Sequence, residues 1–206
     1  VAAQTDAGGQ VVALLGGASG AERYRILHNL NAANRIASGL TVADLNAIIS
    51  GMEDQRAKVI SLMARKLRPN LSAADVVALS GDTRGSTRYT ILHNLNAADR
   101  IASGLTVADL NAIIAGMEDQ RTKVISLMAR KLQPNLSAAD VVALSGDTRG
   151  STRYTILHNL NAANRIASDL TVADLNAIIA GMEDQRAQVV RLLASKLQPD
   201  LASPGV

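Results

Sequence analysis

The chain has 206 residues, of which 48% are hydrophobic, and its 21 Lys and Arg residues exceed its 18 Asp and Glu residues only slightly. The apolar content excludes an intrinsically disordered chain, and the lack of cysteine excludes disulfide frameworks, thiolate nucleophiles and cysteine-based metal sites. No apolar run reaches the roughly 18 residues that a membrane span needs, so we expect no membrane partner.

A tandem repeat of 65 residues organises the chain. The three histidines, His28, His93 and His158, are 65 residues apart, and the surrounding sequence recurs at the same period. Repeats 2 and 3 differ at only nine positions. The division is an N-terminal remnant at 1–5, repeats at 6–70, 71–135 and 136–200, and a C-terminal remnant at 201–206, together one continuous repeat domain. Because Leu201 falls where another copy would begin, we expect a piece of a longer array.

The first element, over residues 6–20, departs from the pattern of the later copies. Its glycines, at 8, 9, 16, 17 and 20, weaken a helix, so we expect a frayed or capping first helix there.

Each later repeat splits into two similar halves, which begin at Leu71 and Leu105 in repeat 2. A hydroxyl residue stands three residues ahead of an aspartate in both halves, as Ser72 with Asp75 and as Thr106 with Asp109. This is the spacing of a capping box, so the sequence predicts that a short helix begins at each point.

A second helix follows in each half. Ile91, Leu92, Leu95 and Ile101 form an apolar stripe in the first half, and the sequence predicts that this helix ends at Ser103-Gly104, where glycine suits a left-handed cap. In the second half, Val124, Ile125, Met128 and Leu132 form the stripe, and Pro134 ends the helix.

Helical hairpins this short cannot bury their apolar stripes alone, so neighbouring hairpins must stack. The sequence therefore predicts an all-α fold, a right-handed superhelical solenoid of stacked hairpins with two hairpins in each 65-residue repeat.

Three kinds of side chain invite a chemical interpretation. A metal site needs several ligands around one ion, and histidines one repeat apart are too distant to share one, so we predict no metal site and interpret His28, His93 and His158 as contacts between hairpins or along a ligand groove. The acidic pair Glu118-Asp119 is typical of a helix start. No nucleophile with a matching base is legible, so we predict no catalytic residues, no cofactor, no small-molecule substrate and no enzyme.

The loop between the two helices of the first half reads Gly-Asp-Thr-Arg-Gly at 81–85 and again at 146–150. Glycine and aspartate make a turn without any ligand. The same loop recurring along one edge of a solenoid is also where such proteins place their contacts. Both interpretations stay open at this point.

The first half opens LSAADVVALSGD at 71–82, which resembles the repeats of transcription-activator-like effectors and their bacterial relatives. Those repeats are helical hairpins that wrap the DNA major groove and present the inter-helix loop to the bases. The resemblance implies a DNA-reading loop. It places Asp82, Thr83, Asp147 and Thr148 nearest the bases and makes Arg84, Arg88, Arg149 and Arg153 candidates for phosphate contact. In the shorter halves the matching pairs are Gly51-Met52, Gly116-Met117 and Gly181-Met182.

Two functional hypotheses follow. The first is a non-catalytic binding module that engages an elongated macromolecule, with double-stranded DNA favoured by the resemblance. The second is a protein-interaction or spacer array of a larger secreted or surface protein. Under this hypothesis the chain is a fragment of a secreted bacterial protein. Because the loop is identical in repeats 2 and 3, the sequence favours a uniform partner or a spacer over a sequence-reading code.

Overall fold

The computed structural model describes residues 2–199. This part of the chain forms twelve α-helices and six short 3-10 helices, and its only β-pairing consists of isolated bridges, which confirms the all-α prediction. It divides into two compact units, which are considered separately: the first extends to Ala102 and includes Ala115–Asp119, and the second holds Ser103–Ile114 and the chain from Gln120 onward. The expected remnant at 201–206 lies outside the described residues.

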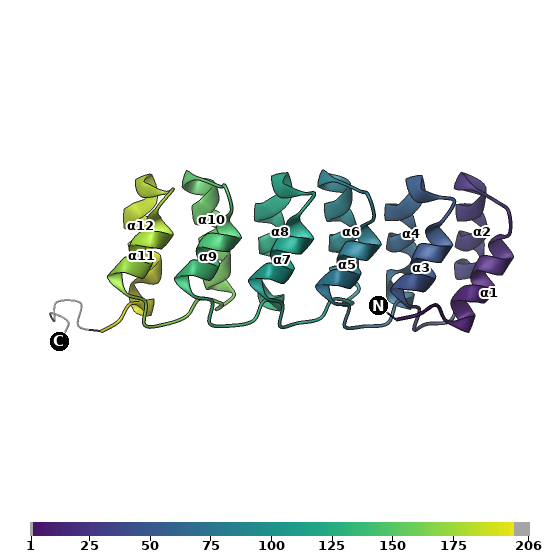
Figure 1. Ribbon diagram of the computed structural model, residues 1–206, viewed down its shortest axis with the longest axis horizontal. Coiled ribbons are helices and arrows are strands. Elements are labelled where there is room, and N and C mark those ends of the chain that lie inside the picture. The colour runs from purple at the N-terminus through teal and green to yellow at the C-terminus, as the bar shows by residue number, and fades with distance from the viewer. Residues whose placement is uncertain (1, 200–206) are drawn as a thin grey trace. The chain divides into compact units, whose positions relative to one another are not determined.

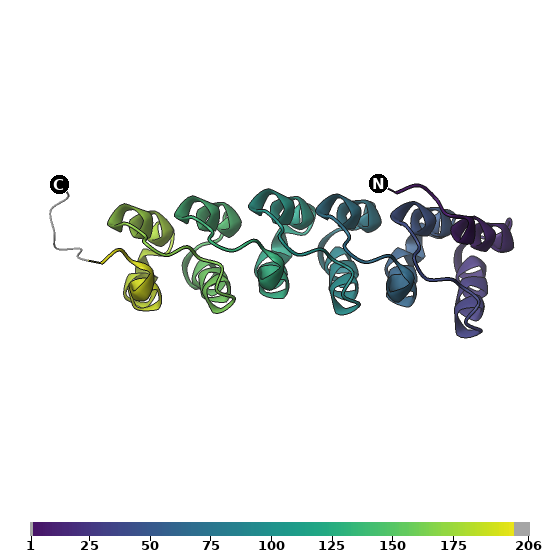
Figure 2. The same ribbon diagram turned by 90° about the horizontal axis from the view of Figure 1, so that it is seen from below.

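Each unit contains three helical hairpins. In the first unit these are α1 (Asp6–Leu15) with α2 (Gly20–Ala32), α3 (Val42–Ile49) with α4 (Arg56–Met63), and α5 (Ala73–Ser80) with α6 (Gly85–Ala97). In the second they are α7 (Val107–Ile114) with α8 (Arg121–Met128), α9 (Ala138–Ser145) with α10 (Gly150–Ala162), and α11 (Val172–Ile179) with α12 (Arg186–Leu193). Within each unit the hairpins follow one another in chain order, with first helices in one layer and second helices in another (Figures 1 and 2).

The first helices begin where the capping boxes predict. The Ser72 hydroxyl accepts a hydrogen bond from the Asp75 N–H at 3.2 Å, and the Asp75 carboxylate accepts one from the Ser72 N–H at 3.0 Å. Thr106 and Asp109 exchange the same two bonds, both at 3.0 Å. Two of the free N–H groups at each helix start are thereby satisfied within four residues of sequence.

The second helices end earlier than the apolar stripes predict. Helix α6 ends at Ala97, and Asp99 adopts a left-handed φ of 56°, so the prediction of an end at Ser103-Gly104 is wrong. The chain beyond α6 is extended instead, because Leu71 accepts a hydrogen bond from the Ala102 N–H and donates one to the Arg100 carbonyl. Helix α8 also stops early, at Met128, before the 3-10 helix Ala129–Lys131.

Helix α1 runs unbroken from Asp6 to Leu15, so of the two forms expected for the first helix, frayed or capping, the frayed one is wrong. Thr5 caps it by accepting a hydrogen bond from the Gly8 N–H at 3.1 Å. A Cβ at Gly8 would overlap the Asp44 carboxylate, so this glycine permits close packing of α1 on α3. Asp44 in turn accepts hydrogen bonds from the Thr5 N–H at 2.6 Å and the Thr5 hydroxyl at 2.8 Å.

The buried Asp44 carboxylate ties this N-terminal hairpin to its neighbour. Burial raises the pKa of Asp44, but the hydrogen bonds that its carboxylate accepts from Thr41 and Thr5 lower it by more, so the pKa lies below its ordinary value. The ionised carboxylate is therefore part of the folded structure.

Buried arginines link three of the hairpins to the hairpin that follows them within a unit. The Arg56 guanidinium, on α4, donates at 2.8 Å to the Leu79 carbonyl in the last turn of α5. It also donates at 2.8 Å to Asn46 and at 2.9 Å to Glu53, which hold it in place. Positive charge at a helix C-terminus is favourable, and the bond satisfies a carbonyl that the helix leaves free.

The same link recurs in both units. In the second unit Arg121 donates at 2.8 Å to the Leu144 carbonyl at the end of α9 and at 2.8 Å to Asn111. In the first hairpin Arg23 donates at 3.1 Å to the Ile48 carbonyl of α3. In these three hairpins the second helix therefore caps the first helix of the following hairpin.

We expect Arg56→Met to lower the free energy of unfolding by about 1.5 to 3 kcal/mol, because charge-assisted bonds to a buried carbonyl are lost. Arg186 is the matched control. It makes the same local bonds, to Asn176 at 3.0 Å and Glu183 at 3.0 Å, but its side chain is 49% exposed against 6% for Arg56. Arg186→Met should change stability by less than about 0.5 kcal/mol in urea unfolding followed by circular dichroism. Equal losses in the two variants would contradict the capping role.

We expect acid to loosen the first hairpin. Because the folded pKa of Asp44 lies below the unfolded value, ionised Asp44 stabilises the fold at neutral pH, and this contribution is lost as the pH falls below about 4. Amide hydrogen exchange of α1 should accelerate there. In Asp44→Asn, exchange of α1 should already be fast at neutral pH and should change little with acid; a wild-type pH profile in that variant would contradict this assignment.

Candidate binding surfaces

The loop between α5 and α6 is a tight turn built around an arginine. Gly81 and Gly85, at its two ends, have φ of 55° and 52°, where other residues are strained. A Cβ on Gly81 would lie 2.6 Å from the Nε of Arg56, and one on Gly146 would lie 2.7 Å from the Nε of Arg121. Gly81 and Gly146 therefore have a structural role, because each makes room for the guanidinium that caps the preceding helix.

The two residues that the resemblance places nearest the bases differ in what they present. Asp82 and Asp147 are exposed. The hydroxyl of Thr83 donates at 2.6 Å to the Ser80 carbonyl, and that of Thr148 donates at 2.6 Å to Ser145. The threonines are thus engaged at the end of the first helix, and only the aspartates offer a free side chain.

The four predicted phosphate contacts separate into two exposed and two interior arginines. Arg84 and Arg149 are exposed, whereas Arg88 and Arg153 are each only 5% exposed. Arg88 donates at 3.3 Å to the Thr83 carbonyl, and Arg153 at 3.5 Å to Thr148. The expectation that Arg88 and Arg153 contact a phosphate at the surface is corrected, because both guanidinium groups lie inside the fold.

Each exposed arginine lies near a buried one. Burial lowers the pKa of Arg88, and the positive charge of Arg84 lowers it further; Arg153 is affected in the same way by burial and by Arg149. The Nε atoms of Arg88 and Arg153 have no hydrogen-bond partner within the described part of the chain. Two like charges and an unsatisfied donor make this a locally unfavourable arrangement.

The loops of the shorter halves present no reading side chain. Met52, Met117 and Met182, the second residues of the pairs implied by the resemblance, are each 1% exposed. They fill the core behind the loop. A contact with a partner from these loops is limited to the neighbouring glycines and acidic residues.

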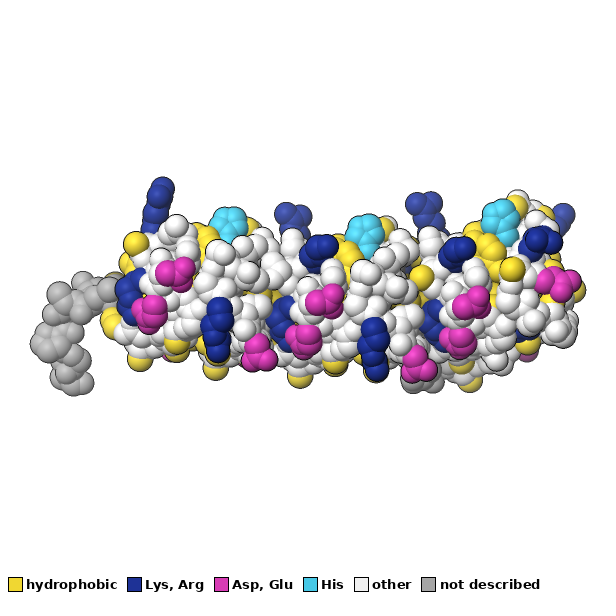
Figure 3. Space-filling view, turned by 90° about the horizontal axis from the view of Figure 1, so that it is seen from above, with side chains coloured by type: hydrophobic (Ala, Val, Ile, Leu, Met, Phe, Trp, Pro, Cys, Tyr) yellow, Lys and Arg dark blue, Asp and Glu magenta, His cyan; other side chains and the backbone are white. Residues whose placement is uncertain are grey.

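Acidic side chains are plentiful along the loops. In the first unit Glu53, Asp54, Asp82, Glu118 and Asp119 are exposed, as is Arg84. In the second unit Asp147, Glu183 and Asp184 are exposed beside Arg149 and Arg186. Figure 3, which looks onto this side, shows acidic and basic side chains mixed along the loops.

The acidic pair at the helix start does more than favour a helix. Glu53 opens the 3-10 helix Glu53–Gln55 and forms a salt bridge of 2.7 Å with Arg56. Its side chain is 62% exposed, so it screens one edge of the buried guanidinium from solvent.

Charge is divided between the two helix layers. None of the six first helices contains Lys or Arg, and the second helices from α4 onward contain no Asp or Glu. The exposed cations of the second-helix layer, including the adjoining 3-10 helices, are Arg25, Lys58, Arg65, Lys123, Arg130, Arg186 and Arg191. The three histidines are exposed in this layer as well. Within each unit, Figure 3 shows histidine together with Lys and Arg on the side away from the acidic groups. We call this side of each unit the second-helix face.

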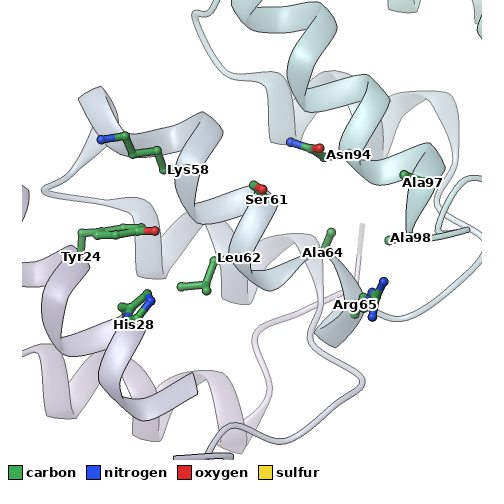
Figure 4. A pocket seen from close by; sticks show the side chains of 10 residues that line it. All are labelled: Tyr24, His28, Lys58, Ser61, Leu62, Ala64, Arg65, Asn94, Ala97 and Ala98. Carbon is green, nitrogen blue, oxygen red and sulfur yellow. The ribbon is translucent and has the colours of Figure 1, made fainter. Parts of the chain in front are cut away.

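In the first unit the second-helix face is hollowed by a groove of about 590 Å³ that runs across α2, α4 and α6. Tyr24 and His28 reach into it from α2, Lys58 and Ser61 line it from α4, and Arg65 from the following 3-10 helix (Figure 4). Each tyrosine lies beside a histidine, with ring centroids 6.2 Å apart in all three repeats. The groove therefore combines two cations with polar and aromatic side chains.

The remaining predictions concern metals and membranes. His28, His93 and His158 are exposed, and residues 2–199 hold no cluster of three or more potential metal ligands. Within the same residues, no helix has both the length and the apolar character to cross a bilayer.

Comparison of the chain with protein-family models, with curated proteins and with solved structures gives no match.

We expect Arg84→Ser and Arg149→Ser to stabilise the protein, because each removes a positive charge beside a buried guanidinium. The first repeat carries Ser19 at this position, and there the equivalent Arg23 donates two bonds to α3, at 3.1 and 3.3 Å. The gain should be about 0.5 kcal/mol for each site at low salt, and it should shrink at high salt. Thermal unfolding at two salt concentrations measures this gain in stability. Destabilisation by either serine substitution would contradict the inferred repulsion between the exposed and the buried arginine.

Proposed function

We propose that the hairpins form one right-handed superhelical solenoid of 65-residue repeats. The arginine link supports this proposal, since it joins α4 to α5 in the first unit and α8 to α9 in the second with the same atoms and the same 2.8 Å distance. Near-identical interfaces repeated along a chain generate a regular superhelix.

We further propose that this solenoid is a non-catalytic module that binds double-stranded DNA through the second-helix face. The division of charge carries the proposal: cations and histidines lie on the second-helix layer, and most exposed carboxylates lie along the loops or at the starts of the first helices. An elongated polyanion gains most from a face that carries cations at regular intervals, because each neutralised phosphate releases counterions.

The groove across α2, α4 and α6 supports the choice of this face. Lys58 and Arg65 lie on one helical segment and are both exposed, so they can reach successive phosphates. Tyr24 and Ser61 add hydroxyl groups of the kind that position a phosphate backbone. The equivalents of Lys58 and Arg65 in the second unit are Lys123 and Arg130, also exposed, so the same contacts are available there.

A protein partner at the loops is the second candidate. The loop edge mixes exposed acidic groups with Arg84 and Arg149, which suits a partner of mixed charge better than a phosphate backbone. It also differs from a DNA-reading loop in that Thr83 and Thr148 are already hydrogen-bonded.

Two pairs of equivalent arginines can distinguish binding at the second-helix face from binding at the loops. Arg65 and Arg130 are equivalent exposed residues of the second-helix face, and Arg84 and Arg149 are equivalent exposed residues of the loops. Binding to a labelled duplex of random sequence should be measured by fluorescence anisotropy over a range of salt concentrations. The double variant Arg65→Gln/Arg130→Gln should lower the slope of log K against log salt by about 1.8, since about 0.9 is lost per phosphate contact.

The double variant Arg84→Gln/Arg149→Gln removes the same charge and should leave that slope unchanged. The reverse pattern would assign binding to the loops, as in the repeats that the sequence resembles. If the wild-type protein does not bind the duplex at about 50 mM salt, the DNA proposal fails, because counterion release is strong under those conditions.

A further inference from the structure

The second-helix layer differs between repeats 2 and 3 in one region. Helices α6 and α10 share the sequence GSTRYTILHNLNA and differ nowhere. Six of the nine positions that differ between the two repeats lie instead within residues 122–130, on α8 and the 3-10 helix that follows it. Within this layer, the second helix of the second half therefore distinguishes the two repeats.

Two kinds of change occur in this region. Some keep an apolar side chain, since Ile125 and Met128 correspond to Val190 and Leu193. Three change the chemistry of an exposed side chain. We call these three positions the triplet, which is Lys123, Ser126 and Arg130 in repeat 2 and Gln188, Arg191 and Ser195 in repeat 3.

The triplet of repeat 1 lines the groove of the second-helix face. Its members are Lys58, Ser61 and Arg65, the same residue types as in repeat 2, and all three lie along the groove across α2, α4 and α6 (Figure 4). They are three and four residues apart, so they follow one side of the helix at intervals of about one turn. Within the described residues, no carboxylate lines this groove. The triplet therefore belongs to a surface that suits an anionic partner.

The positive charge of the triplet has a different place in repeat 3. Repeats 1 and 2 carry a cation at each end of the triplet with serine between them, whereas repeat 3 has uncharged ends and a central arginine. The two ends are seven residues apart, or about 10 Å along the helix axis, so two long cationic side chains there can contact two separate anionic groups. The central arginine brings one charge, about one turn from either end.

Building on the proposed binding of double-stranded DNA by the second-helix face, on which this inference rests, we propose that the triplet determines how each repeat contacts the phosphate backbone. Repeats 1 and 2 each contact two phosphates through the ends of the triplet, and repeat 3 contacts one through its centre. Arg191 is thus a contact residue, although the other repeats carry serine at its position. The repeats are not interchangeable, and exchange of a triplet changes the number of contacts.

Arg186 provides an internal comparison, because it lies on the same helix as Arg191 and outside the triplet. It is also exposed, but its guanidinium donates at 3.0 Å to Asn176 and at 3.0 and 2.7 Å to the Glu183 carboxylate. A guanidinium whose charge is already balanced by a carboxylate gains little from a phosphate. We therefore expect no phosphate contact from Arg186.

Arg191→Gln and Arg186→Gln remove the same charge from the same helix and so test the position of the contact. Binding to a labelled duplex of random sequence should be followed by fluorescence anisotropy over a range of salt concentrations. Arg191→Gln should lower the magnitude of the slope of log K against log salt by about 0.9, the value of one phosphate contact, and Arg186→Gln should leave the slope unchanged. Equal slopes in the two variants would overturn the inference, because Arg191 would then have no special place on the helix.

Exchange of a whole triplet tests the number of contacts. Gln188→Lys/Arg191→Ser/Ser195→Arg gives repeat 3 the triplet of repeats 1 and 2, and it should raise the magnitude of the slope by about 0.9. Gln185→Lys adds the same charge in the loop between α11 and α12 and should leave the slope unchanged. A slope that does not rise in the exchanged variant, or that rises equally in Gln185→Lys, would also overturn the inference.

The DNA proposal and the triplet contacts fail in different ways. A wild-type chain that does not bind the duplex at about 50 mM salt would overturn both, because counterion release is strong there. A wild-type chain that binds, together with an Arg191→Gln variant whose slope matches that of Arg186→Gln, would overturn the triplet contacts and leave the DNA proposal standing.

Discussion

The fold depends on one contact, a guanidinium placed at the C-terminal end of the next hairpin's first helix. Arg56 and Arg121 satisfy carbonyl groups that α5 and α9 cannot satisfy themselves, and they bring positive charge to the negative end of the helix dipole. The surrounding sequence follows from this placement. Glycine must stand at 81 and 146, because any side chain would overlap the guanidinium, and Asn46 and Asn111 orient the arginine from the first helix of its own hairpin.

Local signals in the sequence predict where helices begin better than where they end. The starts depend on pairs such as Ser72 with Asp75, which exchange hydrogen bonds within a few residues and are therefore legible in the sequence. The end of α6 depends on Leu71, which is distant in sequence and draws residues 100 to 102 into an extended bridge. The left-handed residue is Asp99 and not the expected glycine, since aspartate also tolerates that conformation.

The sequence also predicts only part of the candidate surfaces, because the burial of a side chain depends on residues that are distant in the sequence. The exposure of Asp82 and Arg84 follows from their place in a turn. The burial of Arg88 does not, because an arginine near a helix start resembles a surface residue until its neighbours are known. One signal could have revealed it. An arginine recurs in every hairpin at 23, 56, 88, 121, 153 and 186, a spacing that alternates between 33 and 32 residues, and the first five of these arginines are buried. Regular recurrence of a charged residue indicates an internal contact as readily as a binding surface.

The identity of α5 and α9 has a consequence for folding. Both read AADVVALS, so Arg56 meets the same acceptor carbonyl whether it finds the adjacent hairpin or the one a repeat later. Chain entropy then distinguishes them, since closing a loop that is longer by 65 residues costs about 1 kcal/mol more. This preference is small enough that newly made chains should sometimes join hairpins out of order and leave a whole repeat looped out. Order along the array is thus maintained by proximity in the chain, and synthesis from the N-terminus, which offers α5 to Arg56 before α9 exists, favours the correct neighbour.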